Sequence, residues 1–417
     1  MFNEIFNCEC GRSHNCLTKT ILIGENVIDK LSDYLDNYNH ILLVSDINTY
    51  NVAGEKIYKK LNNKIDKSLV LKNNGGTIVI PNEESIDEIN KYIKDVDLVF
   101  GVGSGVINDL CKITSFNNNI PYMIFATAPS MDGYVSKGSA LILKGMKVTL
   151  NALPPLAVFS DINILKDAPI DMIKSGYGDI IGKFSCLNDW KLSSFINNEY
   201  FCQKIYDKVL DTAKEISTLS KEILKRDKVA IGKLMEALVD VGLAMSYTGN
   251  SRPASGSEHH FSHFFEITGI IDNTKYFPHG IDVGFSSIIT SKIREYIINN
   301  IPERKIFNKD KWEGNIKRVY KNISNEVITL QEKLNWYNSD DSIFVLNNWD
   351  KIIDILREAP SSEETLKMIN NIDLNFDDFL NLYNEKKLKD ALLYAKDLKD
   401  RYTILWLYYM YFRGNDD

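Results

Sequence analysis

Histidines are concentrated in one short stretch of this sequence. Of the six in the chain, four fall within 21 residues, namely His259, His260, His263 and His279. On a helix, His259 and His263 lie one turn apart on a shared face, whereas His260 points about 100° away. His279 stands between a proline and a glycine, at the expected boundary of an element. Imidazoles that converge from rigid elements can bind a divalent metal, although each histidine taken alone fits a structural role better.

A carboxylate would complete such a metal site, and the segment SGYGDIIGKFSCLNDW (175–190) supplies one. Asp179 follows two glycines in an apolar context, and Lys183 lies four residues later on the same helical face. An aspartate near a helix start that pairs weakly with a lysine explains these two residues as well. Two histidines and one carboxylate leave open positions on a divalent metal, which then acts as a Lewis acid.

A glycine-rich turn, GVGSGVIND, suggests a phosphate-binding backbone. Gly101, Gly103 and Gly105 follow an apolar run and open a predicted helix. A helix N-terminus attracts the negative charge of a pyrophosphate. Val106 stands where the usual dinucleotide fingerprint has its third glycine, so a tight strand–helix turn explains the motif equally well. The next strand ends in ATAPSMDGYVS, which gathers the polar residues Thr127, Ser130, Asp132 and Ser136 where open α/β sheets bind ligands.

Residues 18 to 160 alternate between strand and helix signals. Asn82 is a plausible N-cap for a helix over 82–94, and 140–161 reads as a hairpin with Gly145 at its turn. Short buried strands that alternate with helices favour a parallel α/β sheet. The strands are predicted at 40–46, 68–73, 77–81, 96–105 and 121–130.

The secondary-structure pattern of the sequence changes after Pro154 and Pro155, which break any regular element. From residue 163 onward, helical periodicity runs almost throughout the chain. We therefore predict an α/β dinucleotide-binding domain over 1–162 and an all-helical metal- and substrate-binding domain over 163–417. The cleft between two domains is a favoured place for a ligand.

Composition excludes several other classes of protein. The net charge is −7, and lysines are interspersed with acidic residues, so no nucleic-acid partner is expected. The sequence has no run of 18 apolar residues and no signal-peptide pattern, so we expect no membrane span and a cytoplasmic protein.

The six cysteines are Cys8, Cys10, Cys16, Cys111, Cys186 and Cys202. Cys8, Cys10 and Cys16 cluster with His14 near the N-terminus, but their Cys-x-Cys start departs from the usual spacing of structural zinc sites. We interpret this segment as a short strand and turn with reduced thiols.

Five motifs, in their order along the chain, resemble the sn-glycerol-1-phosphate dehydrogenase family. They are GVGSGVINDLCK, FATAPSMDGYVS, GYGDIIGKFSCLNDW, SRPASGSEHHFSHFFE and PHGIDVG. The resemblance covers about residues 8 to 300, and the helical tail more loosely. The start CECGRSH and the long tail look like the bacterial, arabinose-operon-associated type. The Gly-Asp and paired histidine motifs are shared more widely, with glycerol dehydrogenase, iron-type alcohol dehydrogenases and dehydroquinate synthase.

The resemblance implies a site made of three parts. A divalent metal, zinc, nickel or possibly iron by its ligand types, would be held by Asp179, His259 and His279. The substrate would lie at Asp132, Asp179 and His263. NAD(H) or NADP(H) would contact Gly103, Ser104, Gly105, Val106, Ile107, Thr127, Ala128, Pro129, Ser130 and Ser136.

Three further residues are candidates from our own reasoning. Lys183 stands where related alcohol dehydrogenases carry a histidine, and a cation there suits a phosphorylated substrate. Arg252 is a second candidate for the phosphate, since guanidinium matches its geometry, with an ion pair as the equal alternative. Asp46 ends an early strand, where it would contact the adenosine ribose and disfavour a 2′-phosphate.

The resemblance implies reversible reduction of dihydroxyacetone phosphate to sn-glycerol 1-phosphate for glycerophospholipid synthesis, by a homodimer. We expect His263 to act as a proton relay beside the metal. Three alternatives stay open: a glycerol or polyol dehydrogenase of the same fold, a dehydroquinate synthase-like lyase, and a non-catalytic nucleotide- or metal-binding protein.

Overall fold

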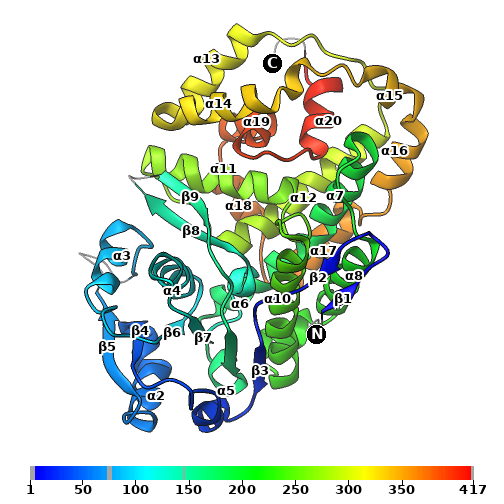
Figure 1. The fold of residues 1–417 in the computed structure, drawn as a ribbon. Helices are drawn as coiled ribbons and strands as arrows, with labels where there is room; N and C mark the ends of the chain where they lie inside the picture. Colours follow the sequence, from blue (N-terminus) through cyan, green and yellow to red (C-terminus); the bar gives the residue numbers. More distant parts are fainter. Residues whose placement is uncertain (1–4, 73–77, 144–145, 415–417) are drawn as a thin grey trace. The chain divides into compact units, whose positions relative to one another are not determined.

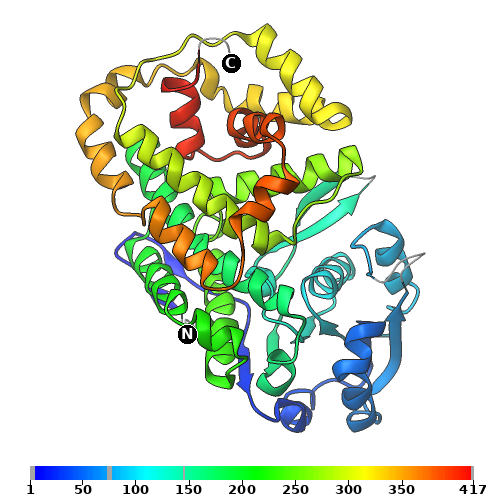
Figure 2. The ribbon, with the colours of Figure 1, turned by 180° about the vertical axis from the view of Figure 1, so that it is seen from behind.

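The computed structural model describes residues 5–72, 78–143 and 146–414, and the chain divides into two units. Unit 1 comprises residues 1–176 and 218–251, and unit 2 comprises residues 177–217 and 252–417. Figures 1 and 2 show the ribbon from opposite sides. Among the described residues, no helix combines the length and apolar character needed to cross a bilayer.

The described part of unit 1 is built on a parallel sheet in the order β3-β10-β7-β6-β4-β5 (Figure 1). This confirms the predicted α/β class. In that order the strands are β3 (Thr20–Gly24), β10 (Ala157–Asp161), β7 (Tyr122–Ala126), β6 (Leu98–Gly103), β4 (Ile41–Asp46) and β5 (Ile65–Leu71). The helical elements are η1 (Val27–Tyr34), α1 (Ile47–Thr49), η2 (Tyr50–Gly54), α2 (Glu55–Lys60), α3 (Glu83–Asn90), α4 (Gly105–Asn118), η3 (Gly133–Val135), α5 (Ile162–Leu165), α9 (Ser220–Leu224) and α10 (Lys228–Thr248). Helix α6 (Ile170–Ile181) begins in unit 1 and belongs to unit 2 from Tyr177 onward.

The inner strands β10, β7, β6 and β4 are mostly apolar and buried because both faces of the sheet are covered there. Successive side chains of a strand point to opposite faces. In β6, Phe100 and Val102 belong to a core that also contains Ile57 of α2. The intervening Gly101 lies against α4, since a Cβ there would meet the Cys111 sulfur at 3.0 Å. A sheet buried on both sides explains the continuous apolar runs of the sequence.

The order in which the chain adds strands to the sheet reverses between β4 and β6. From β4 the chain moves outward to the edge strand β5, and then returns to pair β6 with the other side of β4. Open parallel sheets bind ligands beyond the carboxyl ends of the strands at such a point. The ends of β4 and β6 are Asp46 and Gly103, two of the predicted coenzyme residues.

The predicted strand over 77–81 was wrong where it can be checked. Thr77 lies outside the described residues, and 78–81 form no strand; the neighbouring Asn82 makes only an isolated bridge to Ile142. Ile78 and Ile80 are exposed whereas Val79 between them is buried, so this apolar run is covered on one side only. Asn82 does cap α3, accepting the backbone N–H of Ser85. The hairpin prediction is confirmed by β8 (Gly138–Leu143) and β9 (Met146–Asn151), although Gly145 is outside the described residues.

Helix α10 belongs to unit 1 although it follows a segment of unit 2. It packs against η3, where the Ser246 hydroxyl donates to the Val135 carbonyl at 2.6 Å, and against α5 and β3. Unit 1 therefore also contains residues 163–176 and 218–251, which the boundary predicted after residue 162 assigned to the second domain. The difference arises because α10, whose sequence reads as one more amphipathic helix, covers the α/β unit.

Unit 2 is helical in its described residues, as the sequence predicts (Figure 2). Its helices are α7 (Lys183–Asn197), α8 (Gln203–Ser217), α11 (Ser257–Asp272), α12 (His279–Ile298), α13 (Lys309–Tyr320), α14 (Ser324–Leu334), α15 (Ser342–Asn347), α16 (Trp349–Leu356), α17 (Ser362–Asn370), α18 (Phe376–Leu382), α19 (Glu385–Tyr394) and α20 (Ile404–Tyr411). Tyr383 connects α11 and α12. Its ring stacks on Phe265 at 4.0 Å and its hydroxyl donates to Asp282 at 2.9 Å. The two histidine-bearing helices are thus held together by packing that does not depend on a metal.

Candidate functional site

Three side chains from three helices of unit 2 form a candidate metal site. Asp179 lies on α6, His259 lies on α11, and His279 begins α12. One ligand atom from each residue lies within 4.8 Å of the other two. Asp179 and His259 are buried and His279 is half-buried. The structure therefore brings together the three residues that the resemblance implied as ligands.

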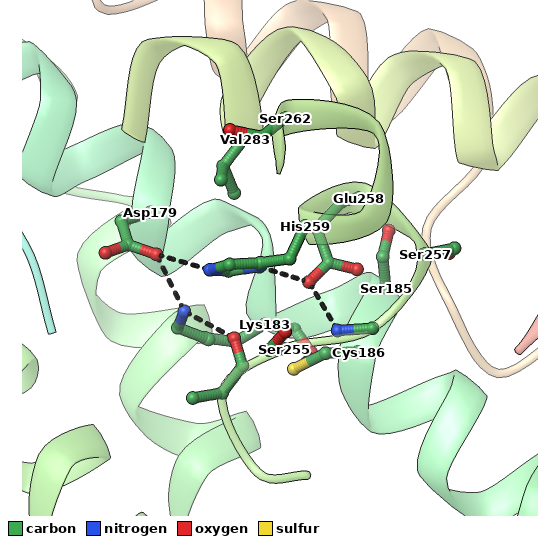
Figure 3. Close-up of polar contacts among 12 residues, drawn as sticks. Asp179, Lys183, Ser185, Cys186, Ser255, Ser257, Glu258, His259, Ser262 and Val283 are labelled. Carbon is green, nitrogen blue, oxygen red and sulfur yellow. Dashed lines mark hydrogen bonds and ion pairs between the residues drawn. The ribbon is translucent and has the colours of Figure 1, made fainter. Parts of the chain in front are cut away.

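Both imidazoles are oriented by a neighbour on the same ring nitrogen. Glu258 Oε1 lies 2.7 Å from His259 Nδ1 and also accepts the backbone N–H of Gly256 (Figure 3). Ser262 Oγ lies 3.3 Å from His279 Nδ1. When Nδ1 is engaged in this way, Nε2 is left to bind a metal. In agreement, His259 Nε2 lies 3.5 Å from Asp179 Oδ1.

Lys183 is fully buried beside the candidate ligand Asp179. Its Nζ donates to Asp179 Oδ1 at 2.9 Å and to the Ala254 carbonyl at 2.8 Å (Figure 3). Burial alone would raise the pKa of Asp179, but the charge of Lys183 and then the hydrogen bond of His259 hold that pKa well below its usual range. The carboxylate is therefore ionised at neutral pH, as a metal ligand must be.

The donor set fits a divalent cation. Burial lowers the pKa of His259, but its hydrogen bonds to Asp179 and Glu258 outweigh this and raise the pKa above the ordinary value. The imidazole thus lies where positive charge is favoured. Two nitrogens and one carboxylate oxygen, with further positions open, suit zinc, nickel or ferrous iron.

The other two histidines of the cluster take different positions. The ring centroid of His263 lies 5.9 Å from that of His259 and 5.4 Å from that of His279. His263 is thus beside the ligand set without belonging to it. His260 is fully buried away from the set, and burial holds its pKa well below the ordinary value. Neither ring nitrogen of His260 has a hydrogen-bond partner among the described residues, so His260 packs as a neutral core side chain.

The predicted coenzyme residues lie in two loops at one edge of the sheet in unit 1. Thr127, which follows β7, donates its backbone N–H to the Gly103 carbonyl at the end of β6. A Cβ on Gly103 would lie 2.6 Å from Ile107, so only glycine lets α4 start directly over the strand end. The first of these loops contains Gly103, Ser104, Gly105, Val106 and Ile107, and the second contains Thr127, Ala128, Pro129, Ser130, Asp132 and Ser136.

A buried lysine that the sequence analysis missed fixes the second loop. Lys112 Nζ donates to the carbonyls of Gly133 and Gly138 at 3.0 and 2.9 Å, and Ser136 Oγ is 3.4 Å away. The sequence feature that could have revealed Lys112 is the presence of a lysine on the apolar face of a predicted helix. Glu258 was also missed, and its signal was an acidic residue directly before the first histidine of the cluster.

Asp46 lies at the end of β4, in the position expected from the sequence. Its Oδ1 accepts the backbone N–H of Thr49 at 2.9 Å, which caps α1. The preceding residue, Ser45, pairs with Val102 of β6. Asp46 is thus near the glycine-rich turn, with its side chain already used in a cap.

Arg252 lies in the ion pair that was the alternative to a phosphate-binding role. Its guanidinium bonds to the Glu199 carboxylate, with Nε 2.6 Å from Oε1, to Ser193 Oγ at 3.1 Å and to the Tyr402 carbonyl at 2.8 Å. The side chain is only 4% exposed. These bonds use each guanidinium nitrogen within unit 2, and the structure therefore favours a structural role for Arg252.

The chain is similar to a family of known proteins and to several individual members. Residues 22–169 match a family model described as iron-containing alcohol dehydrogenase. A glycerol-1-phosphate dehydrogenase [NAD(P)+] of Halalkalibacterium halodurans is 34% identical over 292 residues, which cover 69% of this chain and 73% of that protein. The protein of the same name from Bacillus subtilis is 33% identical, covering 64% of this chain and 70% of its own length.

Solved structures that resemble the chain show the same fold. A glycerol dehydrogenase of Schizosaccharomyces pombe aligns with a TM-score of 0.54 at 17% identity, covering 87% of this chain and 91% of its own. A sulfoacetaldehyde reductase of Bifidobacterium kashiwanohense aligns with a TM-score of 0.59 at 13% identity, covering 98% of both chains. Such identities speak for the fold alone, whereas the closer relatives decide the family. On the identity and coverage of those relatives, the chain belongs to the glycerol-1-phosphate dehydrogenase family.

Proposed function

We propose that the chain catalyses the reversible, NAD(P)H-dependent reduction of dihydroxyacetone phosphate to sn-glycerol 1-phosphate. The observation that carries this proposal is the buried set of Asp179, His259 and His279, whose donor atoms lie within 4.8 Å of one another. The names of the relatives supply the substrate, since each is called a glycerol-1-phosphate dehydrogenase [NAD(P)+].

The reaction adds a hydride to the carbonyl carbon and a proton to its oxygen. When bound, a divalent metal supplies Lewis-acid polarisation, and a reduced nicotinamide supplies the hydride. Asp179, His259 and His279 would hold the metal, and Lys183 would keep the Asp179 carboxylate ionised and in place. His263, half-buried beside His259 and His279, is the candidate that would deliver the proton to the oxygen.

Recognition of the substrate involves residues from the family resemblance and two buried cations. The family resemblance assigns Asp132, Asp179 and His263 to the substrate. Lys183 and Arg252 remain our candidates for its phosphate, although each would have to give up hydrogen bonds within the fold. Buried cations released from such bonds leave carboxylates unpaired, which is costly. We therefore favour a positioning role for Lys183 and a structural role for Arg252.

The coenzyme and the assembly follow from the family resemblance. The loops after β6 and β7 would bind the dinucleotide, with Asp46 at the ribose favouring NADH over NADPH. We also propose a cytoplasmic homodimer whose product is consumed in glycerophospholipid-type synthesis. Which metal the site prefers depends on availability and geometry as much as on affinity.

The deciding experiment is an assay of nicotinamide oxidation on metal-stripped protein. Zinc, nickel or iron would be added back, with dihydroxyacetone phosphate or dihydroxyacetone as substrate and NADH or NADPH as coenzyme. We expect metal-dependent oxidation with the phosphorylated ketone only, and sn-glycerol 1-phosphate as the product by chiral analysis. Activity with the unphosphorylated ketone alone would identify a polyol dehydrogenase. No oxidation under any condition would contradict the proposal and favour a lyase or a binding protein.

His263 has its own test within the same assay. A His263→Ala variant should lose the pH dependence of kcat that a proton relay imposes, and should run more slowly at every pH. Full kcat across the pH range would remove His263 from the mechanism.

A further inference from the structure

A second cluster of metal-ligand side chains lies in unit 1, near the N-terminus. The antiparallel ribbon of β1 (Phe6–Asn7) and β2 (Ser13–His14) places Cys8 and Cys10 in its turn and His14 at its end. The Cys8 backbone N–H donates to the Arg12 carbonyl at 3.0 Å, and Gly11 adopts a left-handed conformation with φ of 83°. This tight turn folds back so that ligand atoms of the two cysteines and His14 lie within 4.8 Å of one another.

His14 is oriented as a metal ligand would be. Its side chain is fully buried, and Nδ1 lies 3.1 Å from the Tyr247 carbonyl. A carbonyl can only accept, so Nδ1 carries the proton and Nε2 presents its lone pair. Nε2 faces the Cys10 sulfur at 3.3 Å. A backbone carbonyl on the far nitrogen is the arrangement that orients metal-binding histidines in proteins.

We propose that Cys8, Cys10 and His14 bind a structural Zn²⁺ ion. Thiolate and imidazole are the ligands of structural zinc, and the six cysteines of the chain are all thiols and not disulfides. With Zn–S and Zn–N bonds of ordinary length, tetrahedral ligand atoms lie roughly 3.5–3.8 Å apart. The 3.3 Å between Cys10 Sγ and His14 Nε2 needs only a small expansion. A fourth donor would complete the tetrahedron.

With zinc bound, the Cys-x-Cys segment would be a metal-stabilised ribbon and not the simple strand and turn predicted from its spacing. Its spacing is short for zinc, but the glycine turn brings in a histidine from the second strand. A ribbon of two-residue strands has little stability of its own. The ion would hold it against the end of α10, where Arg12 donates to the Thr248 carbonyl and His14 to that of Tyr247. The role is structural and independent of the proposed dehydrogenase activity.

Metal content tests the proposal once the other site is disabled. In an Asp179→Asn/His259→Ala background of the full chain, we expect about one zinc ion per chain by mass spectrometry after purification and dialysis. Adding Cys10→Ser or His14→Ala should remove it, whereas Cys16→Ser, in the same segment but outside the cluster, should not. Equal zinc in the Cys10→Ser and Cys16→Ser proteins would overturn the proposal.

A spectroscopic signature keeps the test decisive if a variant folds poorly. Cobalt(II) added to the otherwise unaltered, metal-stripped chain should give a near-ultraviolet thiolate-to-cobalt charge-transfer band, since the Asp179, His259 and His279 set contains no sulfur. X-ray absorption of the zinc form of the Asp179→Asn/His259→Ala protein, in which the other site is disabled, should show at least two sulfur neighbours and one nitrogen. A cobalt spectrum without the thiolate band, or a zinc shell of nitrogen and oxygen alone, would contradict the site. So would a Cys8–Cys10 disulfide found by mass spectrometry in freshly purified protein.

Discussion

The two metal-facing imidazoles depend on neighbours that no metal would touch. Glu258 holds His259 through Nδ1, and Ser262 lies against Nδ1 of His279. These partners fix which nitrogen faces the ligand set, and they add basicity to the ring. The affinity of the site for a metal is therefore set partly by residues next to the ligands.

Replacing Glu258 by glutamine tests this dependence. The amide keeps the size of the side chain but removes its charge, so we expect Glu258→Gln to weaken zinc or nickel binding about 10–100-fold. Titration of the metal-stripped variant with metal, followed by its activity, would measure the loss of affinity. We expect kcat to be restored at saturating metal. Glu266→Gln, on the same helix but outside the ligand set, is the matched control and should bind metal normally. Unchanged affinity in Glu258→Gln would show that His259 orients itself.

Metal binding should also depend on pH through His259. The proton and the metal compete for Nε2, and the pKa of His259 is raised mainly by its hydrogen bonds to Asp179 and Glu258, against an opposing effect of burial. We expect affinity to fall as the pH drops through that raised pKa, and to be regained above it. Removing the Glu258 charge should move the midpoint to lower pH. Calorimetric titration at several pH values would measure both effects, and a midpoint that stays fixed in Glu258→Gln would contradict them.

Lys183 offers a choice between two roles that kinetics can separate. If it positions Asp179, Lys183→Met should weaken metal binding while the KM for dihydroxyacetone phosphate at saturating metal stays within about twofold. If it binds the phosphate instead, KM should rise with metal affinity intact, since truncating a charged hydrogen bond typically costs 1.5–3 kcal/mol, or roughly 10–150-fold. Arg252→Ala provides the comparison for the second candidate, and we expect it to lower stability more than it changes KM.

At the scale of elements, α6 and α12 approach closely where they carry Asp179 and His279. A Cβ on Gly178 would lie 2.3 Å from the Gly280 carbonyl, which is far inside contact distance. The residue beside Gly178 is Asp179 itself. The backbone of α6 thus determines how far the carboxylate reaches toward α12.

Alanine at Gly178 should therefore disturb both packing and metal binding. We expect Gly178→Ala to lower the free energy of unfolding by about 1–3 kcal/mol, because backbone atoms must move apart. Metal affinity should fall with it. Gly314→Ala is the matched control, since Gly314 lies in α13 with nothing within 4 Å of its added Cβ. That variant should gain about 0.5–1 kcal/mol. Denaturant titration would compare the free energy of unfolding of the unaltered chain and the two variants. Equal stability of Gly178→Ala and Gly314→Ala would show that the close approach of α6 and α12 does not limit the residue at 178.

The elements also show what local sequence can and cannot predict. The apolar runs that became β4, β6 and β7 are buried on both faces, so composition alone marked them. The run at Ile78 to Pro81 has the same composition but no neighbouring strand to pair with over its length. Strand pairing depends on residues distant in the sequence. Local hydrophobic periodicity and strand propensity therefore cannot predict it. The histidine spacing predicted α11 as a ligand-bearing helix, and the spacing of Asp179 and Lys183 predicted their pairing. The second acceptor of Lys183, the distant Ala254 carbonyl, could be found only in the fold.

At the scale of the molecule, the metal site joins segments far apart in the chain. Asp179, His259 and His279 meet only in the folded unit 2, so a metal that binds them stabilises that state by mass action. At a free metal concentration 100 times the Kd, the gain is about 2.7 kcal/mol. This would raise the Tm by roughly 5–10 °C for a unit of this size.

Chelation and re-addition of metal should show this shift reversibly in a thermal scan. The same metal-dependent shift in Tm would be measured in a His259→Ala/His279→Ala variant, where it should be largely lost. The difference between the two shifts is the part of the stabilisation that comes from this site. An equal shift in that variant would place the stabilising metal elsewhere.

The interleaving of the two units in the chain has a consequence for synthesis on the ribosome. The last strand of the sheet, β10, ends at Asp161, but α10 ends at Thr248 and is separated from the sheet by a segment of unit 2. At roughly 5–20 residues per second, about 4–17 s pass between the emergence of the two. During that interval the nascent α/β unit exposes side chains such as Val135 of η3 and Ile162 of α5, against which α10 will pack. Speed of translation, and the chaperones that meet the emerging chain, therefore act on this protein most strongly while residues 162–248 are being made.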